Sequence, residues 1–142
     1  MRKKNIKEIC GIIIFAAALL GGYFYLEPMV DNVPQDKYEV VTMKPGMLEA
    51  DYQKAWCTSD FGKMEHVLPD RARVDCLTKD YAIEFDFAKK WAESVGQALY
   101  YGKATDRQPA VVLILEKPED IKYVNRIEKI DAGIKIFLIK TY

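Results

Sequence analysis

A single histidine among 142 residues leaves this chain little room for a Ser-His-Asp constellation or for a zinc site. Its three cysteines show no CxxC spacing, and the chain has no glycine-rich loop of the kind that cradles phosphate. Basic and acidic residues both number 21, so there is no net charge to attract a polyanion, and any nucleic-acid contact needs a local basic patch. Half of the residues are hydrophobic and 30% are charged, which is typical of a globular domain with a real core.

The first 26 residues differ from the rest in charge and hydropathy. Four basic residues, Arg2, Lys3, Lys4 and Lys7, precede an uncharged run from Ile9 to Leu26. That run is just long enough to span the roughly 30 Å apolar layer of a bilayer. The clustered positive charge predicts a cytoplasmic N-terminus and an exported remainder. We therefore expect a single-pass protein of the inner membrane, held there by its N-terminal helix, with a periplasmic or extracytoplasmic C-terminal domain.

Two alternatives exist for this segment. Ala16–Ala18 has the small-residue spacing of a signal-peptide cleavage site, although the apolar stretch before it is short; cleavage there would leave a free periplasmic domain. A buried helix is the other alternative, but it would not need the basic flank. We divide the chain into a signal anchor at residues 1–26, a proline-containing linker at 27–46 and a folded domain at 47–142.

Two cysteines lie in the part that we expect to be exported, where disulfides persist. These are Cys57 and Cys76, whereas Cys10 lies in the anchor. We expect Cys76 to point into the core of the domain. A bridge between Cys57 and Cys76 is one interpretation, and two buried small apolar side chains are the other.

Hydrophobic periodicity and turn residues predict an α/β domain. The stretch 88–102 carries apolar residues at helical spacing and ends at Gly102, a natural C-terminal stop. Pro109–Leu115 is almost wholly apolar, as a central strand covered on both faces would be. The expected elements are a short strand at 38–42, a helix at 47–56, strands at 64–68, 73–78 and 81–87, a helix at 88–102, a strand at 109–115, a helix at 118–129 and a strand at 135–140.

The hairpin over residues 73–87 contains the chain's most informative pattern. If Lys79 and Asp80 form its turn, Asp75 lies directly opposite Glu84 on the neighbouring strand. Like charges paired across a sheet destabilise it by roughly 0.2–1 kcal/mol. Hard cations such as Mg²⁺ take oxygen ligands, often one or two carboxylates. The pairing of Asp75 with Glu84 therefore predicts a site for a divalent cation.

The element order, together with Asp75 and Glu84, resembles the PD-(D/E)XK nuclease superfamily. That family has a restriction-endonuclease-like core of a helix, three strands, a helix and a strand, with acidic residues on the second and third strands. Gln97 and Tyr101 match the QxxxY element of its RecB-like branch. The resemblance covers residues 47–142, with a further helix and strand at the C-terminus. It implies a nuclease that uses Mg²⁺ or Mn²⁺ to cleave DNA or RNA, with Gln97 and Tyr101 positioning the substrate.

The chain departs from this family at one position. The family motif reads acidic-x-Lys, whereas this chain has Glu84-Phe85-Asp86. On the following helix Lys90 lies on the same polar face as Gln97 and Tyr101. We therefore expect Lys90 to supply the catalytic ammonium that the motif lysine supplies in the family.

Three further polar residues have alternative roles. Asp86 is either a contributor to the metal and substrate site or the partner of Arg73, which the hairpin register places opposite it. Family precedent for an acidic residue before the three strands favours Glu65 as a further catalytic acid. His66 is interpreted as structural, with a general-base role left open.

An alternative function belongs to another class. The replaced motif lysine, the neutral charge and the export signal also fit a catalytically degenerate domain that serves as a binding or assembly module of the envelope.

Overall fold

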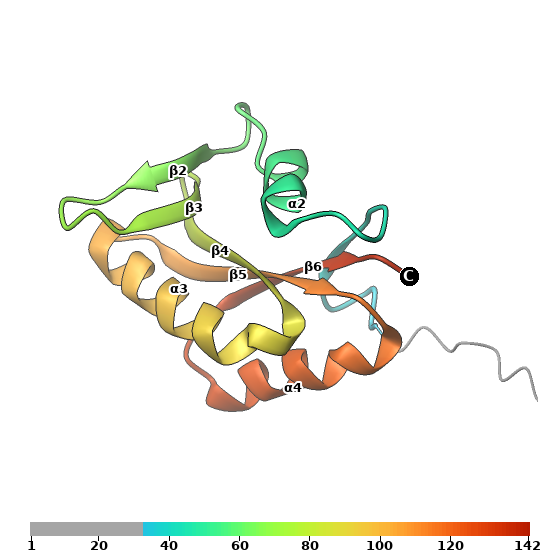
Figure 1. Cartoon of the computed structure of the whole chain (residues 1–142). Coiled ribbons are helices and arrows are strands. Elements are labelled where there is room, and N and C mark those ends of the chain that lie inside the picture. Colours follow the sequence, from blue (N-terminus) through green and yellow to red (C-terminus); the bar gives the residue numbers. More distant parts are fainter. Residues whose placement is uncertain (1–32) are drawn as a thin grey trace, which may run out of the picture. The chain divides into compact units, whose positions relative to one another are not determined.

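The computed structural model describes residues 33–142, which form an α/β domain with a mixed six-stranded sheet and three α-helices (Figure 1). Two 3₁₀ turns, η1 (Ala88–Lys90) and η2 (Pro118–Asp120), lead directly into the second and third helices. The elements are β1 (Glu39–Thr42), α2 (Glu49–Trp56), β2 (Lys63–Val67), β3 (Arg73–Leu77), β4 (Tyr81–Phe87), α3 (Trp91–Thr105), β5 (Gln108–Leu115), α4 (Ile121–Ile130) and β6 (Lys135–Lys140).

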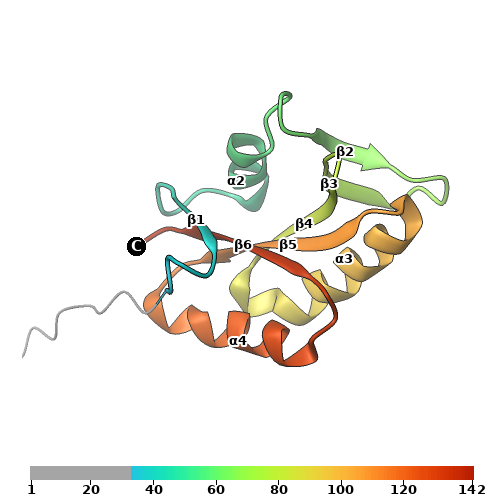
Figure 2. The ribbon, with the colours of Figure 1, turned by 180° about the vertical axis from the view of Figure 1, so that it is seen from behind.

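The sheet has the strand order β1-β6-β5-β4-β3-β2. The four strands from β1 to β4 in this order are parallel, and β3 and β2 continue antiparallel as a meander at the far edge. The two central strands, β5 and β4, are almost wholly buried because helices cover both faces of the sheet. Figures 1 and 2 show α3 and α4 on one face and α2 on the other.

Two apolar clusters fill the space between the sheet and its helices. The cluster under α3 and α4 includes Val111, Leu113 and Leu138 from the sheet, all fully buried. The cluster on the α2 side includes Ile83 and Phe85 of β4. Because side chains alternate along a strand, Glu84, between these two residues, lies on the face of α3, where its charge reaches Tyr101.

The predicted order of helices and strands from 47 to 142 is confirmed, and β1 confirms the short strand expected near residue 40. β1 pairs with β6, and Val33 is buried in the core, so part of the segment expected to be a linker packs with the sheet. The predicted anchor at 1–26 lies outside the described residues. Within residues 33–142, no helix is both long and apolar enough to cross a membrane.

Several predicted boundaries differ from those of the structure, and the end of the long helix is one of them. We expected the long helix to stop at Gly102, but α3 continues to Thr105 and ends at Asp106, which adopts the left-handed conformation of a helix C-cap. Gly102 has a different purpose: a Cβ atom there would lie 3.0 Å from atoms of Pro109 on β5. A hydrogen in place of a side chain lets the helix approach the strand closely.

Candidate acidic site

Four carboxylates from three elements gather where β3 and β4 separate. The hairpin pairs Cys76 with Ile83 and Leu77 with Ala82, which is the predicted register, but the regular pairing stops there. Beyond it, the Asp75 carboxylate accepts a hydrogen bond of 2.8 Å from the backbone N–H of Phe85. A side chain thus replaces the strand hydrogen bond at this position.

The residues of the acidic site are Glu49, Asp75, Glu84 and Asp86, and Lys90 contacts two of them.

Glu84 is the most strongly perturbed of these acids. Its residue is only 6% exposed, and its Oε2 atom is buried with no hydrogen-bond partner. Burial, followed by the negative charge of Asp75, raises the pKa of Glu84 to about 9. Burial also raises the pKa of Asp75, against the hydrogen bond from Phe85, which favours its ionised form. The predicted meeting of Asp75 and Glu84 across the hairpin is therefore a close electrostatic contact.

Asp86 and Lys90 form the polar end of the site. Asp86 is 3% exposed, and its Oδ1 atom accepts a hydrogen bond from the backbone N–H of Phe87. The Nζ atom of Lys90 lies 3.1 Å from this Oδ1 atom and 3.7 Å from Oε2 of Glu49. Contact with Asp86 raises the pKa of Lys90, so its side chain is a cation at neutral pH. The lysine expected to stand in for the family's motif lysine thus lies at the acidic site.

The predicted salt bridge between Asp86 and Arg73 is wrong. Arg73 instead lies opposite Val67 on β2, and its Nη1 atom is 2.9 Å from Oε2 of Glu65. The physical reason is that β3 and β4 pair only at Cys76 and Leu77. Residues of β3 that precede Cys76 have separated from β4, so the extrapolated register no longer holds at Arg73. Asp86 is left with Lys90 as its cation.

Glu65 is linked to the site through Gln53. The Nε2 atom of Gln53 lies 3.0 Å from Oε1 of Glu65 and 2.7 Å from the carbonyl oxygen of Asp75. The negative charge of Glu65 contributes to the raised pKa of Asp75. Glu65 has φ of 50°, a left-handed conformation that costs roughly 1–3 kcal/mol for a residue other than glycine and is common at functional sites. Its neighbour His66 has a buried Nδ1 atom without a hydrogen-bond partner and pairs with Val74 of β3.

The helix α3 turns its polar stripe toward the acids. The amide of Gln97 lies 3.4 Å from the hydroxyl of Tyr101, one turn further along. Tyr101 is buried, and its pKa is raised first by burial and then by the charges of Glu84 and Asp75. The two residues of the QxxxY pattern therefore lie together, with the tyrosine within electrostatic reach of both central carboxylates.

The structure joins Cys57 and Cys76 by a disulfide. The bond connects the end of α2 to the residue that follows Asp75. Both cysteines are buried in the cluster on the α2 side of the sheet, where we expected Cys76 to point.

Sequence reasoning missed Glu49, at the first residue of α2. Burial and the proximity of Asp86 raise the pKa of Glu49 to about 7. The apolar residues of this stretch predict the helix but not the role of its polar face. The spacing of Glu49, Gln53 and Cys57 at i, i+4 and i+8 is a signal that could have found the second, polar face.

The chemistry of these donors fits a divalent cation. In residues 33–142, no group of three or more His, Cys, Asp or Glu side chains is assembled as metal ligands. Asp75 and Glu84 nevertheless supply carboxylate oxygens, which are the ligands that Mg²⁺ and Mn²⁺ prefer. The unpartnered Oε2 atom of Glu84 and its raised pKa mark a site that lacks positive charge. A cation there would satisfy both.

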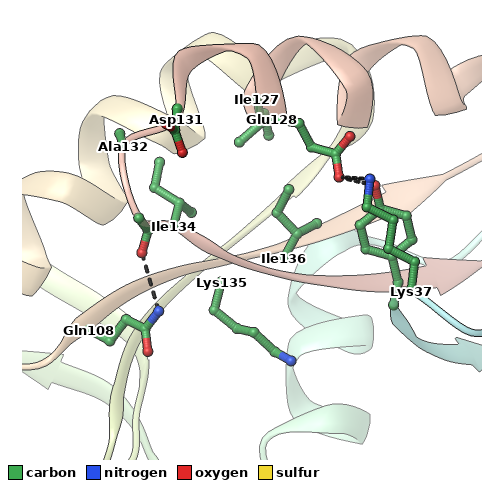
Figure 3. A pocket seen from close by; sticks show the side chains of 11 residues that line it. Lys37, Gln108, Ile127, Glu128, Asp131, Ala132, Ile134, Lys135 and Ile136 are labelled. Carbon is green, nitrogen blue, oxygen red and sulfur yellow. Dashed lines mark hydrogen bonds and ion pairs between the residues drawn. The ribbon is translucent and has the colours of Figure 1, made fainter.

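A cavity separate from the acidic site lies between β6, the C-terminus of α4 and the segment before β1 (Figure 3). Its volume is about 460 Å³, and its apolar wall includes Ile127 and Ile136. Two ion pairs of the domain lie here: Lys37 with Glu128, and Lys135 with Glu39. None of its lining residues belongs to the acidic site. Its lining residues are Lys37, Tyr38, Gln108, Ile127, Glu128, Asp131, Ala132, Gly133, Ile134, Lys135 and Ile136.

No protein-family model, no curated protein and no solved structure matches this chain. The functional interpretation therefore depends on the geometry of the acidic site.

Proposed function

We propose that the domain is a PD-(D/E)XK-like nuclease with a restriction-endonuclease-like core, which hydrolyses phosphodiesters of DNA or RNA with Mg²⁺ or Mn²⁺. We further propose that it is anchored in the inner membrane by residues 1–26 and acts on the extracytoplasmic side. The observation that carries the proposal is the meeting of half-buried Asp75 with buried Glu84. Their neighbour Asp86 contacts Lys90, and the charges of Asp75 and Glu84 reach the QxxxY tyrosine, Tyr101.

In this proposal Asp75 and Glu84 hold the ion, and Glu49 and Asp86 add negative charge around it. When bound, a divalent ion polarises the scissile phosphate and lowers the pKa of the attacking water. The pKa of Glu84 is about 9, so a cation that binds there would displace the proton of this carboxyl group, and burial would then strengthen the attraction between the carboxylate and the ion.

Lys90 supplies positive charge to the same site. Its ammonium is held 3.1 Å from Asp86, and half of the side chain is exposed, so a phosphate oxygen can approach it from solvent. A fixed cation beside a reacting phosphate stabilises the negative charge that develops in the transition state. Gln97 and Tyr101 orient the substrate backbone from α3, since their polar atoms lie together near Glu84.

The experiment uses the full chain, purified in mild detergent, with plasmid DNA, single-stranded DNA and RNA as substrates. We expect cleavage in Mg²⁺ or Mn²⁺ and none in a chelator. The Glu84→Gln variant should lose more than about 100-fold in rate, because even supporting residues around metal sites are worth roughly 10–100-fold. Glu39→Gln is the matched control, since Glu39 lies on β1 at the opposite edge of the sheet. Equal rates for the two variants would contradict the nuclease assignment.

A degenerate binding module of the envelope is the second candidate. The specific observation in its favour is that Lys90 already contacts two carboxylates of the domain, Asp86 and Glu49. A lysine neutralised in this way can hold the acids together without any catalysis. Stabilisation by Mn²⁺ without cleavage of any of the three substrates would favour this candidate over the nuclease.

A further inference from the structure

One face of α2 touches the acidic site at three successive turns. Glu49, Gln53 and Cys57 are spaced four residues apart, so their side chains line up along one side of the helix. Glu49 lies 3.7 Å from Lys90, Gln53 contacts Asp75, and Cys57 is bonded to Cys76. The helix therefore follows the site from one end to the other.

Gln53 reaches the point where the sheet is interrupted. The pairing of β3 with β4 stops at Cys76, whereas on the β2 side Asp75 lies between the pairs Cys76–Met64 and Val74–His66 without being paired itself. The amide of Gln53, in a residue that is only 5% exposed, donates 2.7 Å to the Asp75 carbonyl oxygen. This side chain thus takes the place of a strand neighbour and fixes the backbone that carries the Asp75 carboxylate.

The disulfide holds the other end of the same helix. α2 has eight residues, and an isolated helix of this length is not stable in water. The packing of Tyr52 and Trp56 against the sheet retains the helix as a whole. The Cys57–Cys76 bond adds a covalent link directly beside Asp75, which restricts how far α2 slides or tilts.

We propose that α2 is the positioning element of the acidic site: Gln53 positions Asp75, the Cys57–Cys76 disulfide fixes the helix that carries Glu49, and reduction of this disulfide weakens divalent-metal binding. The inference rests on the proposed function, because it concerns regulation of the same metal site. Gln53 and Cys57 are positioning residues that touch neither metal nor substrate themselves.

The redox step is ordinary thiol–disulfide exchange. One thiol of a dithiol donor attacks a sulfur of the bridge and forms a mixed disulfide with the protein. The second thiol of the donor then attacks this mixed disulfide and frees the protein thiol. Two electrons and two protons pass to the protein, the sulfur–sulfur bond breaks, and Cys57 and Cys76 become thiols. The donor leaves as its cyclic disulfide. Re-oxidation by a disulfide donor reverses the exchange.

The experiment measures Mn²⁺ binding to the full chain in detergent by electron paramagnetic resonance, which reports both affinity and the spectrum of the bound ion. Oxidised protein is compared with protein reduced by dithiothreitol and desalted without oxygen. We expect at least about a 10-fold weaker affinity and a broadened spectrum after reduction, in line with the roughly 10–100-fold effect of groups that orient metal ligands. Re-oxidation should restore both.

Two variants separate positioning from general stability. Gln53→Met keeps the size of the side chain and the disulfide but removes the donor to Asp75, so it should also weaken Mn²⁺ binding. Ile127→Ala removes core volume beneath α4, away from the site, and should lower stability without changing Mn²⁺ affinity or the spectrum of the bound ion. Because Gln53→Met leaves the bridge intact, it tests the inference even if the reduced protein unfolds.

The outcomes distinguish this inference from the proposed function. Equal Mn²⁺ affinity in folded oxidised and reduced protein, with Gln53→Met also unchanged, overturns the inference and leaves the metal site standing. No Mn²⁺ binding in any form overturns the proposed function. Hydrogen exchange then decides whether α2 is held by the bridge: faster exchange on reduction in residues 47–57, but not in α3, supports it, and equal exchange refutes it.

Discussion

The two ends of this sheet treat charge in opposite ways. Around the cavity beside β6, Glu128 and Glu39 each have a lysine of the domain, Lys37 and Lys135, within ion-pair distance. At the separation of β3 and β4, Lys90 contacts two of the four carboxylates, Asp86 and Glu49, and Glu84 is buried with an unpartnered oxygen. Burying unpaired charge is costly. Carboxylates that are each paired with a lysine are explained by the fold alone, whereas an excess of carboxylates over nearby cations is what we expect of the cation site proposed above.

The largest expected effect lies in the apolar sheet between these two ends. Leu113 of β5 is fully buried under α3 and α4. Leu113→Ala should lower the unfolding free energy by about 2–5 kcal/mol, the usual cost of a cavity at such a site. Urea denaturation measures the loss. The charge contrast between the two ends should survive, so Mn²⁺ affinity of the folded variant should equal that of the wild type; a changed affinity would show that core packing and site are not separable.

The pH dependence of stability sharpens the contrast. The pKa values of Glu84 and Glu49 rise from 4.5 to about 9 and about 7 on folding. Between these limits the folded chain holds protons that the unfolded chain has released, so the unfolding free energy falls as pH rises from 4.5 toward 9. Thermal unfolding in a chelator should show this decline, and Mg²⁺ should offset it most at the alkaline end.

Glu84→Gln is the control for this prediction. The amide cannot ionise, so the variant should show a shallower decline and should exceed the wild type in stability at alkaline pH by on the order of 1 kcal/mol or more, the cost of an unsatisfied buried group. If wild type and variant decline in parallel, the acids are not the source of the pH dependence, and the contrast between the two ends of the sheet is wrong.

The smallest expected change in stability is at the end of the sheet where each carboxylate is paired with a lysine. The Nζ atom of Lys135 lies 2.8 Å from Oε1 of Glu39, whose side chain is 69% exposed. Glu39→Gln should change the unfolding free energy by less than about 1 kcal/mol, because solvent screens such pairs. Chemical denaturation at low and high salt checks this. A change as large as that of Leu113→Ala would remove the distinction between structural and functional charge.

Most of the fold follows from patterns visible in the sequence. The apolar run of β5 and the alternation along β4 give the sheet its core, and the turn at Lys79 and Asp80 sets the register of Cys76 with Ile83. The register could not be extended to Arg73, because the Asp75 side chain takes the Phe85 N–H and the strands part. Local alternation carries no information about where a ladder ends.

The site was predictable where it depends on neighbouring strands and unpredictable where it depends on packing between distant elements. Asp75 and Glu84 come from one hairpin, so their proximity could be read from the chain. Glu49 approaches Asp86 from α2, which lies on the face of the sheet opposite α3, and no periodicity in the sequence reports a contact between residues so far apart in the chain. The prediction that Gly102 ends the helix is wrong for a related reason. The residue that requires a glycine there is Pro109 on β5, which is not part of the helix.

That glycine has a consequence for the chemistry of the site. Tyr101 immediately precedes it, and the depth at which α3 settles on β5 determines how far the phenol extends toward Glu84. A Cβ atom at residue 102 would lie 3.0 Å from atoms of Pro109, so the helix or the strand would have to shift slightly, and a shift of the helix would carry Tyr101 with it. The reach of a polar side chain on this helix is thus set by the smallest residue beside it.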